Sequence, residues 1–389
     1  MRAFLILLLS CLNFLPWHAA SAQTPASANA NVLPITIDAG PVNASINRPF
    51  VSVTVCMPGS RTDCRTIDHV MVDTGSSGLR ILASALDLPL PQQTLADGSA
   101  LVECTQFLTH VAWGPVKQAD VRLAGEQASA IPIQLIGGAE FPNVPADCAG
   151  VAPLVDGVQS LRANGLLGVG VFIQDCGLPC AQTASLGFYY ACAPAGCQPA
   201  LAPLERQVQH PVPFFPADNN GVVIKLPPAA AHGLASATGE LVFGIGTQAN
   251  NTLGAASVLA VNPAGYFTTF YKGVARVKGF IDSGSNGIFF SDTELPVCST
   301  GSYCPAMPQV LGAFNQGSNG AAIATAFHLD NVEALVRLNP GLAVFDGLGY
   351  YNASAAEFDW GLPFFFGRSV FTAIEGKSTP GGTGPYYAY

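Results

Sequence analysis

Two short segments of this 389-residue chain carry the same motif, and each contains an aspartate that could do chemistry. The first reads Asp-Thr-Gly-Ser from Asp73, and the second reads Asp-Ser-Gly-Ser from Asp282, 209 residues later. Each follows an apolar run and is followed by a second one. A repeat at about half the chain length predicts two related lobes that each supply one aspartate. Two carboxyl groups held close together share a proton, so one can act as an acid and the other as a base.

A second pair of motifs follows the two aspartates. An apolar-apolar-Gly sequence ends at Gly168 in the first half and at Gly367 in the second half. Glycine lets a neighbouring backbone approach closely, so we expect each of these glycines to lie in a strand beneath its Asp motif. The proline-rich segment 199–216 separates the halves, and we place the boundary between the lobes near residue 210.

The paired motifs and the glycines that follow them resemble the active-site loops of the pepsin-like aspartic peptidases. The resemblance extends to segment 239–246, which is similar to the strand that opens the second lobe of that family, and to the C-terminal segment 364–374. It implies an all-β, bilobal fold with two homologous barrel-like lobes around a central cleft. The whole chain also resembles an uncharacterised family of exported bacterial proteins, most clearly at 359–368 and 381–386. This second resemblance implies no activity.

The pepsin-like resemblance implies a catalytic role for Asp73 and Asp282, which would activate a water molecule for peptide-bond hydrolysis. Such a pair titrates as a unit, so the sequence does not assign the acid and the base. The neighbouring residues would support the pair. Hydroxyls would bind the carboxylates, other hydroxyls would link the two loops, and glycines would allow tight turns. These residues are, in that order, Ser76 and Ser285, Thr74 and Ser283, and Gly75 and Gly284.

The first half departs from the pepsin-like pattern. In that family the first loop continues to a tryptophan that is hydrogen-bonded by a tyrosine on a flap. Here Arg80 takes the place of the tryptophan, and the expected flap segment, 104–114, contains no tyrosine. Phe107 and Trp113 are the aromatic candidates for the flap, although Trp113 also suits a core position. Two main hypotheses remain open: an aspartic-type endopeptidase with a different flap, or a non-catalytic binding or inhibitor protein on the same scaffold. A third is a cell-envelope structural protein stabilised by disulfides.

The N-terminal segment predicts export. Residues 1–22 have the features of a signal peptide, with an apolar run and a small-residue cleavage site that ends at Ala22. Lipoprotein anchoring at Cys11 is an alternative. The expected location is the periplasm, the cell surface or the medium. We divide the chain into a signal peptide (1–22), a flexible leader (23–33), an N-terminal lobe (34–209) and a C-terminal lobe (210–389).

The cysteines support the same location. The chain has 11 cysteines, and 10 remain without Cys11. An even number in an exported protein predicts disulfides, here five, although sequence alone does not fix their connectivity. The pairings that we favour are Cys56 with Cys64, Cys104 with Cys148, Cys176 with Cys180, Cys192 with Cys197, and Cys298 with Cys304.

Composition limits the possible functions. Hydrophobic residues make up 49% of the chain and charged residues 11%, and the 41 glycines and 30 prolines are scattered, which favours many short strands and turns. The net charge of −9 argues against nucleic-acid binding. No metal-binding motif occurs, and nothing indicates a cofactor. After the signal peptide, no segment has the length and apolarity of a transmembrane helix. We therefore expect a monomer that acts on a peptide or protein substrate.

Overall fold

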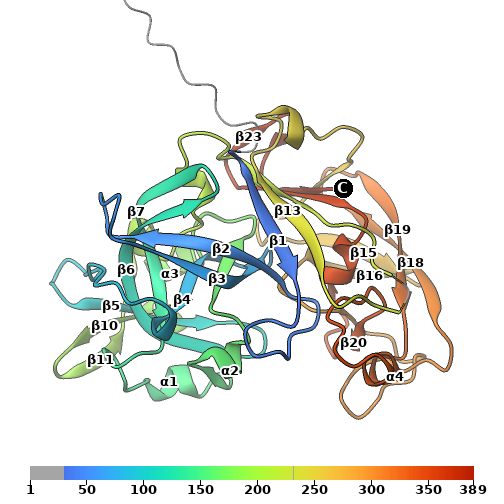
Figure 1. Cartoon of the computed structure of the whole chain (residues 1–389), viewed down its shortest axis with the longest axis horizontal. Helices are drawn as coiled ribbons and strands as arrows, with labels where there is room; N and C mark the ends of the chain where they lie inside the picture. The colour runs from blue at the N-terminus through green and yellow to red at the C-terminus, as the bar shows by residue number, and fades with distance from the viewer. Residues whose placement is uncertain (1–29, 231) are drawn as a thin grey trace, which may run out of the picture.

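The computed structural model describes residues 30–230 and 232–389. It is mainly β, with 43% strand and 11% helix, and its strands form two lobes with a sheet between them (Figure 1). The predicted all-β, bilobal fold is therefore confirmed. The predicted signal peptide and residues 23–29 of the predicted leader lie outside the described residues.

The first lobe contains a closed barrel of six strands. In order around the barrel these are β2 (Pro49–Cys56), β3 (Cys64–Asp73), β9 (Gly165–Val169), β4 (Ser77–Leu82), β7 (Glu126–Ile136) and β6 (Val111–Leu123). The barrel closes because β6 pairs with both β7 and β2. Closure leaves no free strand edge. Alternate residues of β2, namely Val51, Val53 and Val55, are buried in the core, as the period of two in a strand requires.

A smaller sheet extends from the first half of β6. Its strands are β5 (Ala100–Gln106), β8 (Leu154–Val155), β10 (Tyr189–Ala193) and β11 (Gly196–Pro199). The hairpin of β5 and β6 is the segment that the sequence analysis identified as the flap. Three short helices, α1 (Ala146–Ala149), α2 (Val158–Leu161) and α3 (Leu178–Gln182), lie in the connections of this lobe.

A six-stranded sheet joins the two lobes. Its strands, in order, are β1 (Val32–Ile37), β13 (Ala237–Phe243), β12 (Gly221–Lys225), β22 (Ser369–Ala373), β25 (Tyr386–Ala388) and β14 (Val258–Ala260). β1 and β13 lie side by side between the lobes in Figure 1 and pair along their whole length. Val32 pairs with Val242, and the side chain of Leu33 is buried. The prediction of a flexible leader is therefore wrong for residues 32 and 33, which belong to β1.

The second lobe is built on a seven-stranded sheet. Its strands, in order, are β19 (Ala322–Leu329), β18 (Gln309–Gln316), β15 (Phe267–Tyr271), β16 (Val274–Ile281), β21 (Glu357–Trp360), β17 (Ile288–Phe290) and β20 (Gly349–Tyr351). β21 is parallel to β16 and antiparallel to β17, just as β9 is parallel to β3 and antiparallel to β4. The repeat seen in the sequence is thus a repeat of this three-strand unit, although the lobe boundary near residue 210 stays a prediction.

Short elements complete the fold. They are α4 (Val332–Leu338), the two-residue strands β23 (Ser378–Thr379) and β24 (Gly382–Thr383), and the 3₁₀ helices η1 (Ala83–Ala85), η2 (Ala184–Leu186), η3 (Leu204–Arg206), η4 (Val212–Phe214), η5 (Ala249–Asn251) and η6 (Leu362–Phe365). Across residues 30–230 and 232–389, helices of the length and apolarity that a membrane crossing needs are absent.

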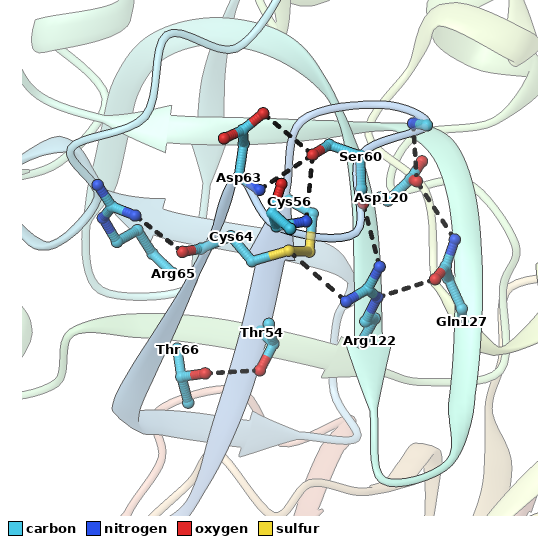
Figure 2. The surroundings of a disulfide bond; sticks show 12 residues. Thr54, Cys56, Ser60, Asp63, Cys64, Arg65, Thr66, Asp120, Arg122 and Gln127 are labelled. Carbon is cyan, nitrogen blue, oxygen red and sulfur yellow. Dashed lines mark hydrogen bonds between the residues drawn. A yellow bond between two sulfur atoms is a disulfide. The ribbon is translucent and has the colours of Figure 1, made fainter.

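The five predicted disulfides all form. Figure 2 shows the one between Cys56 and Cys64, which closes the loop between β2 and β3. Arg122 on β6 supports this loop by donating hydrogen bonds to the carbonyl oxygen of Ser60, at 3.1 Å, and to the side chain of Gln127 (Figure 2). Five disulfides are consistent with an exported protein.

Candidate active site

The two Asp motifs form matching loops at the ends of matching strands. Asp73 is the last residue of β3, and Asp282 directly follows β16. The backbone N–H of Gly75 donates to Oδ1 of Asp73 at 2.8 Å, and that of Gly284 donates to Oδ1 of Asp282 at the same distance. These bonds orient each carboxyl group, because a backbone N–H in a tight loop has a fixed direction.

Serine hydroxyls bind the second oxygen of each carboxyl group. Ser76 Oγ donates to Oδ2 of Asp73, and Ser285 Oγ lies 2.8 Å from Oδ2 of Asp282. Hydrogen bonds donated to a carboxylate favour its ionised form. Both loops therefore carry the hydroxyl contacts that the sequence analysis expects.

Thr74 and Ser283 join the two loops at their base. The backbone N–H of each donates to the side-chain oxygen of the other, at 3.1 Å to Ser283 Oγ and 2.9 Å to Thr74 Oγ1. Each hydroxyl then donates across the interface to a carbonyl oxygen, Thr74 to Ile281 and Ser283 to Val72. All four bonds are buried, so the two loops are held in one fixed relation.

The two carboxyl groups face each other across this junction. A Cβ atom built on Gly75 would lie 2.6 Å from the carboxyl carbon of Asp282, and one built on Gly284 would lie 2.8 Å from that of Asp73. Each carboxyl thus occupies space that only a glycine in the opposite loop leaves free. Burial, followed by the charge of Asp73, raises the pKa of Asp282 well above its usual value. The structure therefore brings together the two aspartates and the six supporting loop residues that the sequence predicts.

Asp359, which the sequence analysis did not single out, is a third carboxyl group at this site. It lies on β21, opposite Phe280 of β16, and is only 2% exposed. Its Oδ2 is 2.6 Å from Ser285 Oγ, which also contacts Asp282. Burial raises the pKa of Asp359 well above its usual value, and the charges of Asp73 and Glu357 add to this shift.

The serine between Asp359 and Asp282 has only one proton to donate. Both contacts are satisfied when a protonated Asp359 donates to Ser285 Oγ and Ser285 donates to Asp282. Oδ1 of Asp359 has no hydrogen-bond partner among the described residues, which fits a group that is neutral rather than charged. The sequence did contain a signal, because Asp359 is the one charged residue in segment 358–367.

The glycine beneath the second loop is Gly361 and not Gly367, so that prediction is wrong. Gly168 lies opposite Asp73 in the β3–β9 pair, and a Cβ there would clash with the backbone of Ser76 and Ser77. Gly361 follows β21 and has the corresponding place, against the backbone of the second loop. Gly367 lies beyond η6, has a φ of +73°, and faces Pro228. The phenylalanine run that suggested Gly367 forms η6 and the core instead of the strand.

The two flap candidates lie in different places. Phe107 is in the turn between β5 and β6, where its ring stacks on His110 at a centroid distance of 4.6 Å. Trp113 is inside the sheet, with its ring against Tyr190 and its Nε1 donating to the carbonyl oxygen of Phe141. Trp113 is therefore a core residue, and of the two only Phe107 lies at the hairpin turn.

Arg80 is the centre of a buried ionic network. It is 1% exposed and forms ion pairs with Glu103 at 2.8 Å and with Asp175 at 3.0 Å. Its Nε donates to Thr105 Oγ1 on β5, and NH1 donates to the carbonyl oxygen of Ser77. Arg80 thus ties the first Asp loop to the strand that leads into the flap hairpin, at the position where the pepsin-like pattern has a tryptophan.

Residues 27–389 match the model of a family described as a protein of unknown function, DUF3443. The chain belongs to this family. No curated protein matches it. Among solved structures, the crystal structure of an aspartic proteinase from Irpex lacteus matches with a TM-score of 0.50 and 15% sequence identity, over 92% of this chain and 96% of that chain. The DUF3443 chain therefore has the pepsin-like fold, as the paired motifs predicted.

Proposed function

We propose that this DUF3443 protein is an aspartic-type endopeptidase in which Asp73 and Asp282 activate a water molecule. The main support is the pair of glycines, Gly75 and Gly284, each of which leaves room for the carboxyl group of the opposite loop. Two carboxyl groups at such close range share a proton, as in the aspartic proteases. A packed structural site would not need two acids that are costly to bury.

In the proposed reaction, the ionised carboxylate takes a proton from the water molecule as the water oxygen attacks the peptide carbonyl carbon. The protonated carboxyl gives its proton to the carbonyl oxygen, and a tetrahedral intermediate forms. The C–N bond then breaks as a proton moves to the leaving nitrogen. Burial and the charge of Asp73 raise the pKa of Asp282, which favours one proton shared by the pair before substrate reacts.

The five disulfides favour an oxidising compartment for this protein. Cell fractionation tests this location.

A non-catalytic binding protein is the second candidate. It is favoured by the flap hairpin, whose turn carries Phe107 and His110 and lacks a tyrosine. A binding protein would hold a peptide at the same site but would not need a shared proton.

Substitution of the paired aspartates separates the two candidates. We expect the purified protein to cleave an unfolded protein substrate at acid pH. Asp73→Asn and Asp282→Asn should each reduce kcat by about 10⁴-fold or more, because either change leaves a single carboxyl group that cannot act as both acid and base. Cleavage products identified by mass spectrometry are the readout. Asp97→Asn, at an exposed turn, is the matched control and should keep full activity.

A thermal melt of each variant shows that any loss of activity is not a loss of folding. Full activity in either Asp73→Asn or Asp282→Asn would contradict the proposal. Binding of peptides without cleavage at any pH between 2 and 8 would favour the binding protein.

A further inference from the structure

A pocket of about 470 Å³ lies beside the second Asp loop, and residues of both halves of the chain line it. Three of its lining residues are arginines: Arg48 before β2, Arg162 after α2, and Arg337 on α4. Glu333 is the one acidic residue that lines it. The lining therefore carries a positive charge, although the net charge of the whole chain is −9.

The arginines have neutral hydrogen-bond partners. Arg48 donates to the carbonyl oxygen of Leu161 at 2.7 Å, and Arg162 donates to that of Ala44 at 3.2 Å. In the part of the chain that the structure describes, none of the three arginines forms an ion pair with an acidic side chain. Burial, and then the charge of Arg162, lowers the pKa of Arg48 to about 10. An anion in the pocket would offset this repulsion.

The pocket adjoins the proposed catalytic cleft. Asn286, which lines the pocket, directly follows Ser285 of the second Asp loop. Arg48 contacts the sulfur of Met71, two residues before Asp73 on β3. Burial lowers the pKa of His110 in the flap hairpin, the charge of Arg48 lowers it further, and the charge of Asp73 opposes this shift. An extended peptide advances about 3.3 Å per residue, so a side chain a few residues from the scissile bond would reach the pocket.

We propose that this pocket binds an acidic side chain of the peptide held at the Asp73–Asp282 pair. Guanidinium groups bind carboxylates through paired, charge-assisted hydrogen bonds, and the exposed side chains of Arg162 and Arg337 are free to turn toward such a group. The proposal rests on the function proposed above and adds a substrate preference: peptides with a glutamate or aspartate a few residues from the bond that is cleaved.

A peptide series tests the preference. One glutamate is placed at each position of a neutral peptide, and each peptide is compared with its glutamine analogue at pH 5, where most of the glutamate is ionised. For the wild-type protein we expect one position at which the ratio of kcat/KM for the glutamate peptide to kcat/KM for its glutamine analogue is about ten or more. Arg162→Gln and Arg337→Gln should each reduce this ratio, and the double variant should bring it close to one. Arg65→Gln, which removes the same charge from an exposed site on β3, should leave the ratio unchanged.

Binding to the Asp73→Asn variant separates this inference from the proposed catalysis. Fluorescence anisotropy gives the Kd of the same peptides without cleavage. Tighter binding of the glutamate peptide that depends on Arg162, together with a wild-type protein that cleaves none of the peptides, would uphold the pocket and reject the peptidase. Cleavage with equal kcat/KM for glutamate and glutamine at every position would reject the pocket and keep the peptidase.

Inorganic phosphate provides the remaining comparison. If phosphate binds in a manner that depends on Arg162 while glutamate and glutamine peptides bind equally, the pocket is a site for free anions and the inference is wrong. The inference is also wrong if the double variant keeps the preference for glutamate, or if neither peptide binds.

Discussion

At the scale of the residue, the unusual feature is a third acid behind the pair of aspartates. Asp359 contacts Ser285, and Ser285 contacts Asp282, so the protonation of one carboxyl affects the other. The corresponding position of the first lobe, Leu166 on β9, is apolar. The second lobe therefore contains a buried acid at a position where the fold can accommodate a hydrophobic side chain.

Replacement of Asp359 should shift the pH profile of activity. Asp359 is neutral while it keeps its proton, but once it ionises its negative charge adds to the effects of burial and of Asp73, which raise the pKa of Asp282. Asp359→Asn removes that part of the rise. The pair then loses its shared proton at a lower pH, and the alkaline limb of kcat/KM moves toward acid while the acid limb stays in place. The measurement is kcat/KM from pH 2 to 8.

Asp359→Leu, which restores the residue type of the first lobe, should give the same shift if the charge is responsible. An unchanged alkaline limb in both folded variants would show that Asp359 has only a structural role.

At the scale of the element, Arg80 connects the first Asp loop to the flap strand β5. Its guanidinium group compensates Glu103 and Asp175, which are both buried. In the pepsin-like pattern, a tryptophan and a tyrosine occupy this region. In this structure Arg80 binds β5 through Glu103 and Thr105, and its guanidinium group also lies 5.8 Å from the centre of the Phe107 ring in the turn.

We expect Arg80→Met to lower the free energy of unfolding by about 3–5 kcal/mol at neutral pH, because two acids are left buried without a cation. Urea denaturation gives the value. Arg80→Met combined with Glu103→Gln should recover part of the loss, since one of the two acids is removed.

One control completes this experiment. Lys278→Met, at an exposed ion pair with Glu357, should cost less than about 1 kcal/mol. A loss for Arg80→Met as small as that for Lys278→Met would contradict the assigned role.

At the scale of the whole molecule, the buried acids make stability depend on pH. Asp175, Asp282 and Asp359 all have a pKa raised well above the usual value, with burial as the main cause. Between the unfolded value, about 3.9, and the raised folded values, these three acids bind more protons in the folded protein than in the unfolded chain. The half-buried His110 and the buried His210, whose pKa values burial lowers, act in the opposite direction. Because the acids outnumber the histidines, we expect stability to fall as the pH rises through this window.

The midpoint of urea unfolding should accordingly be highest near pH 4 and should decrease toward pH 7. Asp359→Asn should flatten this decrease, because an amide has no proton to lose. A matched exposed variant, Asp97→Asn, should leave the slope as it is in the wild type. A midpoint that rises from pH 4 to pH 7 would contradict the predicted linkage.

The sequence by itself determined the features that are written in short, contiguous motifs. The two Asp loops could be recognised because every residue of each loop lies within four positions of its aspartate. Four of the five disulfides join cysteines only four to eight residues apart, so proximity in the chain suggested their pairing. The two-lobe division followed from the repeat and the fold class from the resemblance that the motifs carry, while the catalytic role of the pair stays a prediction.

Only the tertiary structure decided which distant segments meet at those motifs. The register between β16 and β21, whose paired residues are 79 positions apart in the chain, puts Asp359 and Gly361 beneath the second loop instead of Gly367. Arg48, Arg162 and Arg337 come from three separate parts of the chain and share one pocket. The physical reason is that strand register and lobe packing are set by the burial of whole surfaces, so a local motif cannot specify its distant neighbours.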